Sequence, residues 1–365
     1  MAPQSTAENS VQDLGLNRAA IVASGVDTLY LSGRGMLSGS VWNELVERKA
    51  EAQDADAPVP YALSGEPVAV CAVGLNRYPI RLNHRYGFVG VTSSSALPTV
   101  RFQPLGEFLH GIGVRNMVEW FEAWMREIVV GLKLTVARVD LFADTTGWVL
   151  TASDRHRFLS RASLRDTHED GDDWTGFEFG RHKGGNVMAR VYDKTRNIEQ
   201  RRTLWWRDIW GRSVKDGDTV RRVEIEFGRS ALRTFNVDTP DDVFRSLGDL
   251  WKYGTEKWLT FRSPTADATK ARWPITPEWT LVQSAGLSLP ALGVTRTYEA
   301  RDAAEYEALL PGLTGYASSV AARKGATDLD SLLRAVRLAL LEYEKKTDVR
   351  VADRIASKRW EASTS

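Results

Sequence analysis

Three stretches that lie far apart in the chain share the alternation of a β-strand, and this limits the folds open to the sequence. They are RVDLFAD at residues 138–144, NVMARVYDK at 186–194 and RRVEIEF at 221–227. Successive side chains in a strand point to opposite faces, so each stretch places apolar residues on one face and charged residues or tyrosine on the other. If the three strands are neighbours, they form a sheet with one apolar and one polar face.

The polar face predicted in this way carries the residue types of a site for phosphate and metal. Its members are Arg138, Asp140, Asp144, Arg190, Tyr192, Lys194, Arg222, Glu224 and Glu226. Carboxylates suit Mg²⁺ or Mn²⁺, which take oxygen ligands, so the metal candidates are Asp140, Glu224, Glu226 and Asp144. Arg190 and Lys194 flank Tyr192, and nearby cations favour the phenolate and hold phosphodiester oxygens. The pattern therefore predicts metal-assisted transesterification with Tyr192 as the nucleophile.

Two simpler interpretations stay open at this point. A tyrosine in a strand is most often a packing residue, because aromatic side chains favour strands. Arg and Glu two apart on adjacent strands most often form a surface ladder of ion pairs. The occurrence of these residue types on all three strands favours a functional site over either alternative.

A basic segment that contains tryptophan follows the second strand. In RRTLWWRDIWGR, at residues 201–212, Trp205, Trp206 and Trp210 are interspersed with arginines. Bases stack on aromatic rings while arginines hold phosphates, so the segment predicts a platform for single-stranded DNA. The alternative is an amphipathic helix that packs its tryptophans on the sheet. With the basic GRHKGGN turn included, the DNA-binding candidates are Arg181, Lys183, Arg201, Arg202, Trp205, Trp206, Arg207 and Arg222.

The remaining sequence predicts an α+β fold. We expect a curved, largely antiparallel sheet packed with helices, and a small, mostly helical C-terminal region. Helical spacing of apolar residues predicts helices near 40–51, from about residue 115 to near Gly131, and around 154–165, with an acidic loop at 166–173. The predicted organisation is a flexible tail at 1–20, a catalytic domain at 21–262, and a linker with a helical region at 263–365.

Composition narrows the classes of protein. The 48 Lys and Arg nearly balance the 47 Asp and Glu, so a polyanion site must come from local clustering. The single cysteine, Cys71, excludes an internal disulfide and a cysteine-based zinc site. The N-terminal segment is polar and no apolar stretch is long enough to span a bilayer, so we expect a cytoplasmic protein without membrane contact.

The segment FEFGRHKGGNVMARVYDKTRNIE, at residues 177–199, resembles the F-G-x-R and R-[IV]-Y-x-K-x-x-E motifs of the replication initiation factor family. This family comprises the Rep_trans-type rolling-circle replication initiators. RVDLFAD and RRVEIEF lie upstream and downstream in the expected order, and the resemblance is strongest between residues 138 and 229. The family glutamate that follows the lysine comes later here, at Glu199. The His-hydrophobe-His motif of another class of rolling-circle nickases is missing.

The resemblance implies that Tyr192 attacks one strand at a replication origin, becomes joined to the 5′ phosphate and leaves a 3′ hydroxyl that primes a polymerase. Arg190 and Lys194 occupy the matching flanks. It also implies Mg²⁺ or Mn²⁺ on Asp140 and Glu224, with Glu226 and Asp144 as further ligand candidates. The implied partners are origin DNA in duplex and single-stranded form, a second copy of the chain, a host helicase and a DNA polymerase.

Other functions remain open from the sequence. A conjugative relaxase of an integrative element would use the same chemistry, and a DNA-binding regulator would keep the fold without catalysis. A hydrolytic metal nuclease would leave Tyr192 structural. Binding alone needs no carboxylate cluster, so Tyr192 together with acidic residues on three strands favours the nicking enzyme.

Overall fold

The computed structural model describes residues 19–181, 186–287, 313–347, 350–352 and 355. The chain divides into two compact units, of which unit 1 comprises residues 1–30 and 135–290 and unit 2 comprises residues 31–134 and 291–365. Two long strands, β1 (Ala20–Leu37) and β7 (Val129–Thr146), contribute residues to both units. No helix in the described ranges is long and apolar enough to span a lipid bilayer.

Unit 2 contains five short strands in sequence, followed by two helices. Its elements are α1 (Gly39–Asp54), β2 (Val59–Leu63), β3 (Glu66–Val70), β4 (Ile80–His84), β5 (Gly87–Val91), β6 (Val100–Pro104), α2 (Gly106–Ile112), α3 (Val114–Arg126) and, in its C-terminal part, α10 (Leu329–Thr347). The apolar face of α3 is buried, and Phe121 stacks on Phe102 of β6 with ring centroids 4.5 Å apart. The predicted helix near 40–51 is therefore confirmed as α1, and the amphipathic helix as α3.

The amphipathic helix α3 ends earlier than its sequence pattern predicts. Helical structure was expected to continue to near Gly131, but α3 ends at Arg126 and β7 begins at Val129. Ile128, Val129 and Val130 are β-branched and favour strands over helices. Gly131 has φ of +67°, a left-handed conformation that stops a right-handed helix. The apolar run after Arg126 thus belongs to the sheet.

Unit 1 contains the three stretches with strand alternation, at residues 138–144, 186–194 and 221–227. Its strands besides β1 and β7 are β8 (Phe158–Ser160), β9 (Arg165–Asp170), β10 (Asp173–Phe179), β11 (Val187–Asp193), β12 (Arg221–Gly228) and β13 (Leu259–Phe261). Its helices and helical turns are η1 (Ala152–Arg157), α4 (Lys194–Gln200), α5 (Trp206–Trp210), η2 (Gly211–Ser213), α6 (Arg229–Thr234), α7 (Pro240–Lys252), η3 (Tyr253–Trp258), η4 (Lys270–Arg272) and α8 (Pro277–Gln283).

Eleven strands form one open, hydrogen-bonded sheet in the order β2-β3-β4-β5-β6-β1-β7-β12-β11-β10-β9. The predicted α+β class with a large antiparallel sheet is confirmed. The strands of RVDLFAD, RRVEIEF and NVMARVYDK are β7, β12 and β11, and they are neighbours. Their register places Glu226 opposite Asp140, and Glu224 opposite Arg190, so the predicted polar residues lie on one face.

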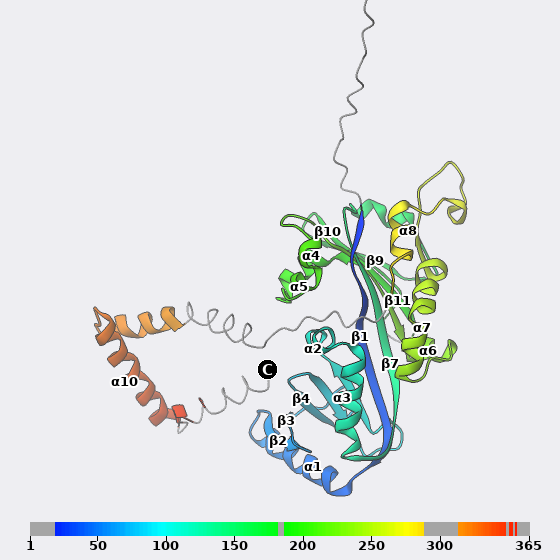
Figure 1. Cartoon of the computed structure of the whole chain (residues 1–365). Coiled ribbons are helices and arrows are strands. Elements are labelled where there is room, and N and C mark those ends of the chain that lie inside the picture. Colours follow the sequence, from blue (N-terminus) through cyan, green and yellow to red (C-terminus); the bar gives the residue numbers. More distant parts are fainter. Residues whose placement is uncertain (1–18, 182–185, 288–312, 348–349, 353–354, 356–365) are drawn as a thin grey trace, which may run out of the picture. The chain divides into compact units, whose positions relative to one another are not determined.

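The two faces of this part of the sheet are covered by different helices of unit 1. On the apolar face, Phe235, just after α6, packs against Phe227 of β12, and Gly254 of η3 lies directly against Ile225. On the polar face, Trp206 of α5 packs against Phe142 of β7. Figure 1 shows α6 and α7 on one side of these strands and α4 and α5 on the other. The segment that follows β11 therefore lies over part of the polar face.

The helix expected around residues 154–165 is wrong. A six-residue 3₁₀ helix, η1, begins with a capping box between Thr151 and Asp154, and the chain then extends into β8 and β9. Pairing of β8 with β13 buries Phe158 completely, a long-range contact that local spacing does not reveal. The acidic stretch at 166–173 is not a loop but the β9–β10 hairpin, which turns at Gly171 with φ of +64°.

Candidate active site

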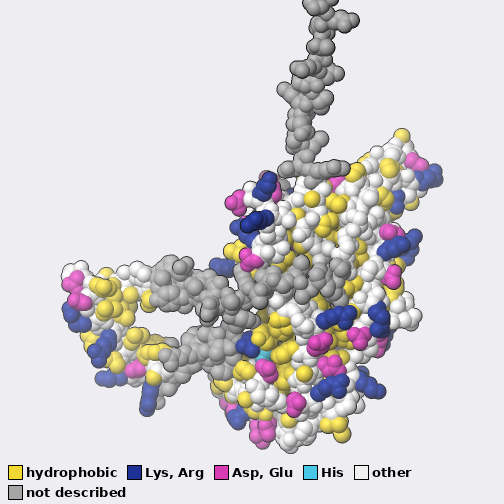
Figure 2. Space-filling view, in the orientation of Figure 1, with side chains coloured by type: hydrophobic (Ala, Val, Ile, Leu, Met, Phe, Trp, Pro, Cys, Tyr) yellow, Lys and Arg dark blue, Asp and Glu magenta, His cyan; other side chains and the backbone are white. Residues whose placement is uncertain are grey.

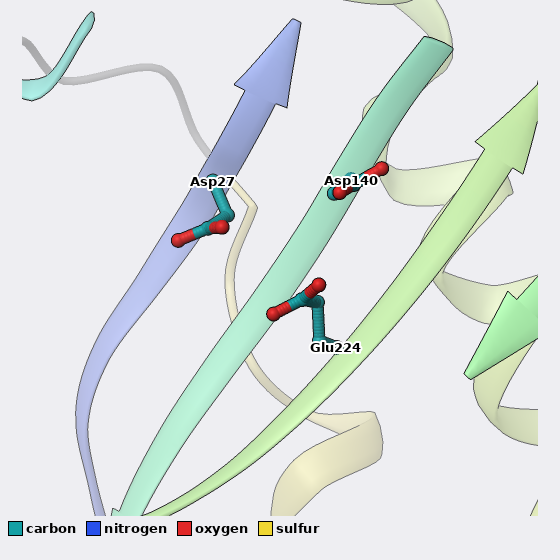
Figure 3. Close-up of side chains that lie close together, drawn as sticks. All are labelled: Asp27, Asp140 and Glu224. Atoms are coloured by element: carbon teal, nitrogen blue, oxygen red, sulfur yellow. The ribbon is translucent and has the colours of Figure 1, made fainter. Parts of the chain in front are cut away.

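Three carboxylates converge on the polar face of unit 1. Asp27 of β1, Asp140 of β7 and Glu224 of β12 come from three successive strands of the sheet, and each offers an oxygen within 4.8 Å of the other two. Figure 3 shows these three side chains, which we call the carboxylate trio. Asp140 and Glu224 are buried, whereas Asp27 is partly exposed. Two of the four predicted metal ligands are thus brought together, with a third carboxylate that the sequence did not single out.

The trio has the donor chemistry of a divalent-cation site. Burial raises the pKa of Asp140 to about 8, with Glu224 and Glu226 adding to the rise against the hydrogen bonds from Arg138. Like-charged carboxylates in a buried cluster repel one another, and a hard divalent cation with oxygen ligands offsets that repulsion. Asp27, Asp140 and Glu224 are therefore the residues that would hold Mg²⁺ or Mn²⁺.

Two arginines brace the buried members of the trio. Arg138 donates from Nε to Asp140 Oδ1 at 2.8 Å, and Arg190 pairs with Glu224. Both guanidinium groups also reach Glu226 Oε2, at 2.9 Å from Arg138 and 3.0 Å from Arg190. Glu226, a predicted metal ligand, thus lies in the ion-pair network behind the trio. Arg190, expected to flank the nucleophile, holds carboxylates in this structure.

Tyr192 points its hydroxyl at the trio. The Tyr192 Oη donates a hydrogen bond to Glu224 Oε2 at 3.0 Å. Burial and the nearby Glu224 raise the Tyr192 pKa well above its ordinary value, although Arg222 acts in the opposite direction. The expected stabilisation of the phenolate by neighbouring cations is therefore not what this arrangement gives. The phenol is protonated, and it donates this proton in the hydrogen bond to the Glu224 carboxylate.

Lys194, expected beside the nucleophile, begins α4 with its side chain buried. Its Nζ lies 4.4 Å from the centroid of the Trp206 ring and 5.9 Å from that of Tyr192. Burial, and then the positive charge of Arg222, lowers the Lys194 pKa to about 8. The Lys194 ammonium group therefore lies near the Tyr192 ring, but it loses its proton at a lower pH than an ordinary lysine does.

Asp144, the fourth predicted metal ligand, is engaged elsewhere. It is fully buried and accepts two hydrogen bonds from Arg222, at 2.6 Å and 2.7 Å, and one from the indole of Trp210, at 2.8 Å. Arg222 is itself fully buried and Trp206 is 3% exposed. These two side chains were predicted to contact DNA, but they present almost no surface to it in this structure.

The trio and Tyr192 line a cleft of about 600 Å³. Its rim includes two arginines and two amides from α4 and the residue after it, namely Arg196, Asn197, Gln200 and Arg201. Of the predicted DNA contacts, Arg201 lines this cleft. Arg202 and Arg207, which follow it in the sequence, are exposed, and Trp205 is half-buried. On the face that Figure 2 shows, basic and acidic side chains are interspersed, which matches a net charge of +1.

The other predicted DNA contacts lie apart from this cleft or outside the described residues. Arg181 lines a different cleft, of about 750 Å³, together with Arg161, Tyr253 and Trp258. Lys183 lies outside the described residues. The arginine of α4, Arg196, was missed from sequence although it lines the site, and it pairs with Asp173 at 3.2 Å.

Asp27 is the member of the carboxylate trio that the sequence did not identify. Its only local signal is an acidic residue within the strand-like run VDTLYLSG, at residues 26–33. More than a hundred residues separate it from Asp140, and only the placement of β1 beside β7 brings them together. An alternating strand that carries one carboxylate is too common to identify a ligand by itself.

Comparison with solved structures finds similarity to a rolling circle replication initiator protein from Geobacillus stearothermophilus. The two chains are 16% identical, the TM-score is 0.44, and the match covers 75% of this chain and 99% of that one. No family model matches the sequence, and no curated protein matches it.

Proposed function

We propose that this protein is a rolling-circle replication initiator that nicks and rejoins origin DNA through a covalent 5′-phosphotyrosine intermediate on Tyr192. The observation that carries the proposal is the hydrogen bond of 3.0 Å from the Tyr192 hydroxyl to Glu224, a member of the carboxylate trio. A nucleophile, a proton acceptor and a set of oxygen ligands for a divalent cation thus meet in one cleft. These are the parts that phosphodiester transesterification requires.

In the proposed reaction, Tyr192 Oη attacks the phosphorus of a phosphodiester while Glu224 accepts its proton. A bond forms between Oη and phosphorus, the bond from phosphorus to the 3′ oxygen breaks, and the departing 3′ oxygen takes a proton from water to become a hydroxyl. When Mg²⁺ or Mn²⁺ is bound by the trio, its charge neutralises the phosphate and favours the phenolate. Rejoining is the reverse: the 3′ hydroxyl gives its proton to water and attacks the phosphotyrosine, and Glu224 returns its proton to the leaving Tyr192 oxygen.

Residues around the cleft supply contacts for the nucleic acid. Arg196 and Arg201 line its rim, and neither is buried. Arginine binds phosphate oxygens in a sequence-independent way and contributes most of the salt-dependent affinity. As an initiator the protein would act on origin DNA, duplex and single-stranded, as a homodimer that works with a host helicase and a DNA polymerase.

The test is a nicking assay on supercoiled plasmid that carries the gene's own upstream and coding region, in the presence of Mg²⁺. Wild type is expected to give a nicked circle with protein attached to its 5′ end, which protease digestion removes. Tyr192→Phe loses this adduct completely because the phenol is the attacking group. The matched control is Tyr86→Phe, in unit 2, whose ring stacks on Phe108 with centroids 3.8 Å apart and which should nick like wild type.

The possible outcomes separate the candidate functions. Equal nicking by wild type and Tyr192→Phe, with no attached protein, would show a hydrolytic nuclease and refute the proposal. DNA binding without nicking by either protein would identify a non-catalytic regulator. An adduct at a transfer origin rather than a replication origin would identify a conjugative relaxase, which shares the chemistry and differs only in the DNA site.

A further inference from the structure

We propose that Trp210, Asp144 and Arg222 form a positioning network that holds Asp27 in the carboxylate trio and thereby sets the affinity of the site for a divalent cation. None of the three is a ligand in this proposal. The inference rests on the metal-binding part of the proposed function. It gives the tryptophan-rich segment after β11 a role other than the DNA platform that its sequence suggests.

The network is a continuous chain of hydrogen bonds from α5 to the trio. The indole Nε1 of Trp210 donates to Asp144 Oδ2 at 2.8 Å. Asp144 accepts from Arg222 through both carboxylate oxygens, at 2.6 Å and 2.7 Å, and Arg222 Nη1 donates to Asp27 Oδ1. Asp144 and Arg222 face each other in the register of β7 and β12, so the backbone already aligns the pair.

The middle of this chain is fixed by its surroundings. Arg222 and Asp144 are both 0% exposed, and the Arg222 guanidinium carbon lies 4.0 Å from the ring centroids of both Phe142 and Trp206. Phe142, Trp206 and Trp210 belong to one buried apolar cluster. An Arg–carboxylate pair that is joined by two hydrogen bonds and completely buried has little freedom to rotate. Arg222 therefore presents Nη1 to Asp27 from a single direction.

Asp27 has more need of such support than its two neighbours. The Asp27 side chain is 21% exposed, whereas the side chains of Asp140 and Glu224 are 1% and 6% exposed. Each member of the trio pairs with its own arginine, Asp140 with Arg138, Glu224 with Arg190 and Asp27 with Arg222. Arg222 differs because it is completely buried and anchored by α5. Hydrogen-bonded partners of ligating carboxylates orient them, and their loss lowers metal affinity by about 10–100-fold.

The experiment measures Mn²⁺ binding to the full-length protein without DNA, by the electron paramagnetic resonance signal of free Mn²⁺. Trp210→Phe keeps most of the ring and removes the N–H that Asp144 accepts. We expect it to weaken Mn²⁺ binding about tenfold. The matched control is Trp251→Phe, because Trp251 is also buried in unit 1 and donates its indole N–H, to the Val282 carbonyl at 3.0 Å, on the opposite face of the sheet. It should bind Mn²⁺ like wild type.

Several outcomes decide the question. Equal Mn²⁺ affinity for wild type, Trp210→Phe and Trp251→Phe overturns the positioning role, and so does equal weakening in both variants, which would indicate general loss of structure. Nicking by Trp210→Phe should recover at excess Mn²⁺, whereas Tyr192→Phe should not. If wild type binds Mn²⁺ no better than Asp140→Asn, the metal site and this inference both fail. Tenfold weaker binding in Trp210→Phe together with an inactive wild type would uphold the network and refute the nickase.

Discussion

The raised pKa of Asp140 predicts that metal binding depends steeply on pH. Burial, aided by Glu224 and Glu226, raises this pKa from 3.8 to about 8, so the folded protein holds a proton that a cation must displace. At about pH 6 only on the order of 1% of such a carboxyl is ionised, and at about pH 7 on the order of 10%. Mn²⁺ affinity is therefore expected to rise about tenfold per pH unit up to about pH 8 and then to level off. A carboxyl with an ordinary pKa would give constant affinity over this range.

The assay is the same Mn²⁺ titration at about pH 6, 7, 8 and 9 and constant ionic strength, with calorimetry in two buffers to count the released proton. Lys194 lines the same cleft and has a pKa lowered to about 8, so Lys194→Met is the control and should keep the pH dependence. An affinity that changes less than about threefold between pH 6 and 8 would refute the buried, proton-holding trio.

Two further predictions concern residues around Tyr192. The Lys194 pKa is lowered from 10.5 to about 8. Between these two pH values the unfolded chain therefore binds more protons than the folded one. The contribution of Lys194 to the free energy of unfolding should thus rise with pH through this window, by up to about 3 kcal/mol. Urea unfolding should show this rise in wild type and not in Lys194→Met, and identical pH dependence in both proteins would contradict it. A Cβ on Gly176 would lie 2.9 Å from the Tyr192 Cβ, so Gly176→Ala should shift β10 or β11, cost about 1–3 kcal/mol of stability and lower nicking. Gly248→Ala, in α7 with no atom within 4 Å of the added group, should be neutral or slightly stabilising, and equal behaviour of the two variants would argue against the clash.

Much of the site could be predicted from sequence because strand alternation is local. Alternation within each strand predicts that Asp140, Tyr192 and Glu224 share a face, and the register of β7, β12 and β11 keeps them there. Alternation could not predict which carboxylates on that face come close to one another. Asp144 lies on the same face of β7 as Asp140, yet it lies opposite Arg222 and forms an ion pair with it rather than joining the trio.

What escaped prediction depends on contacts between distant segments. Asp27 joins the site only through the position of β1 in the sheet, and Phe158 lies in a strand rather than a helix because it pairs with β13. The tryptophans of α5 have a composition that suits both nucleic-acid stacking and core packing. Burial of Trp206 and Trp210 supports packing, and no local pattern distinguishes the two roles.

The order of synthesis determines when the carboxylate trio can form. Asp27 and Arg222, which pair in the folded chain, are separated by 195 residues, and unit 1 is interrupted by the continuous stretch 31–134 of unit 2. A ribosome that adds about 5–20 residues per second needs on the order of 10–40 s to make the intervening chain. During that time β1 has emerged without the strands that complete its side of the site. A nascent chain therefore has no carboxylate trio until β12 has been synthesised.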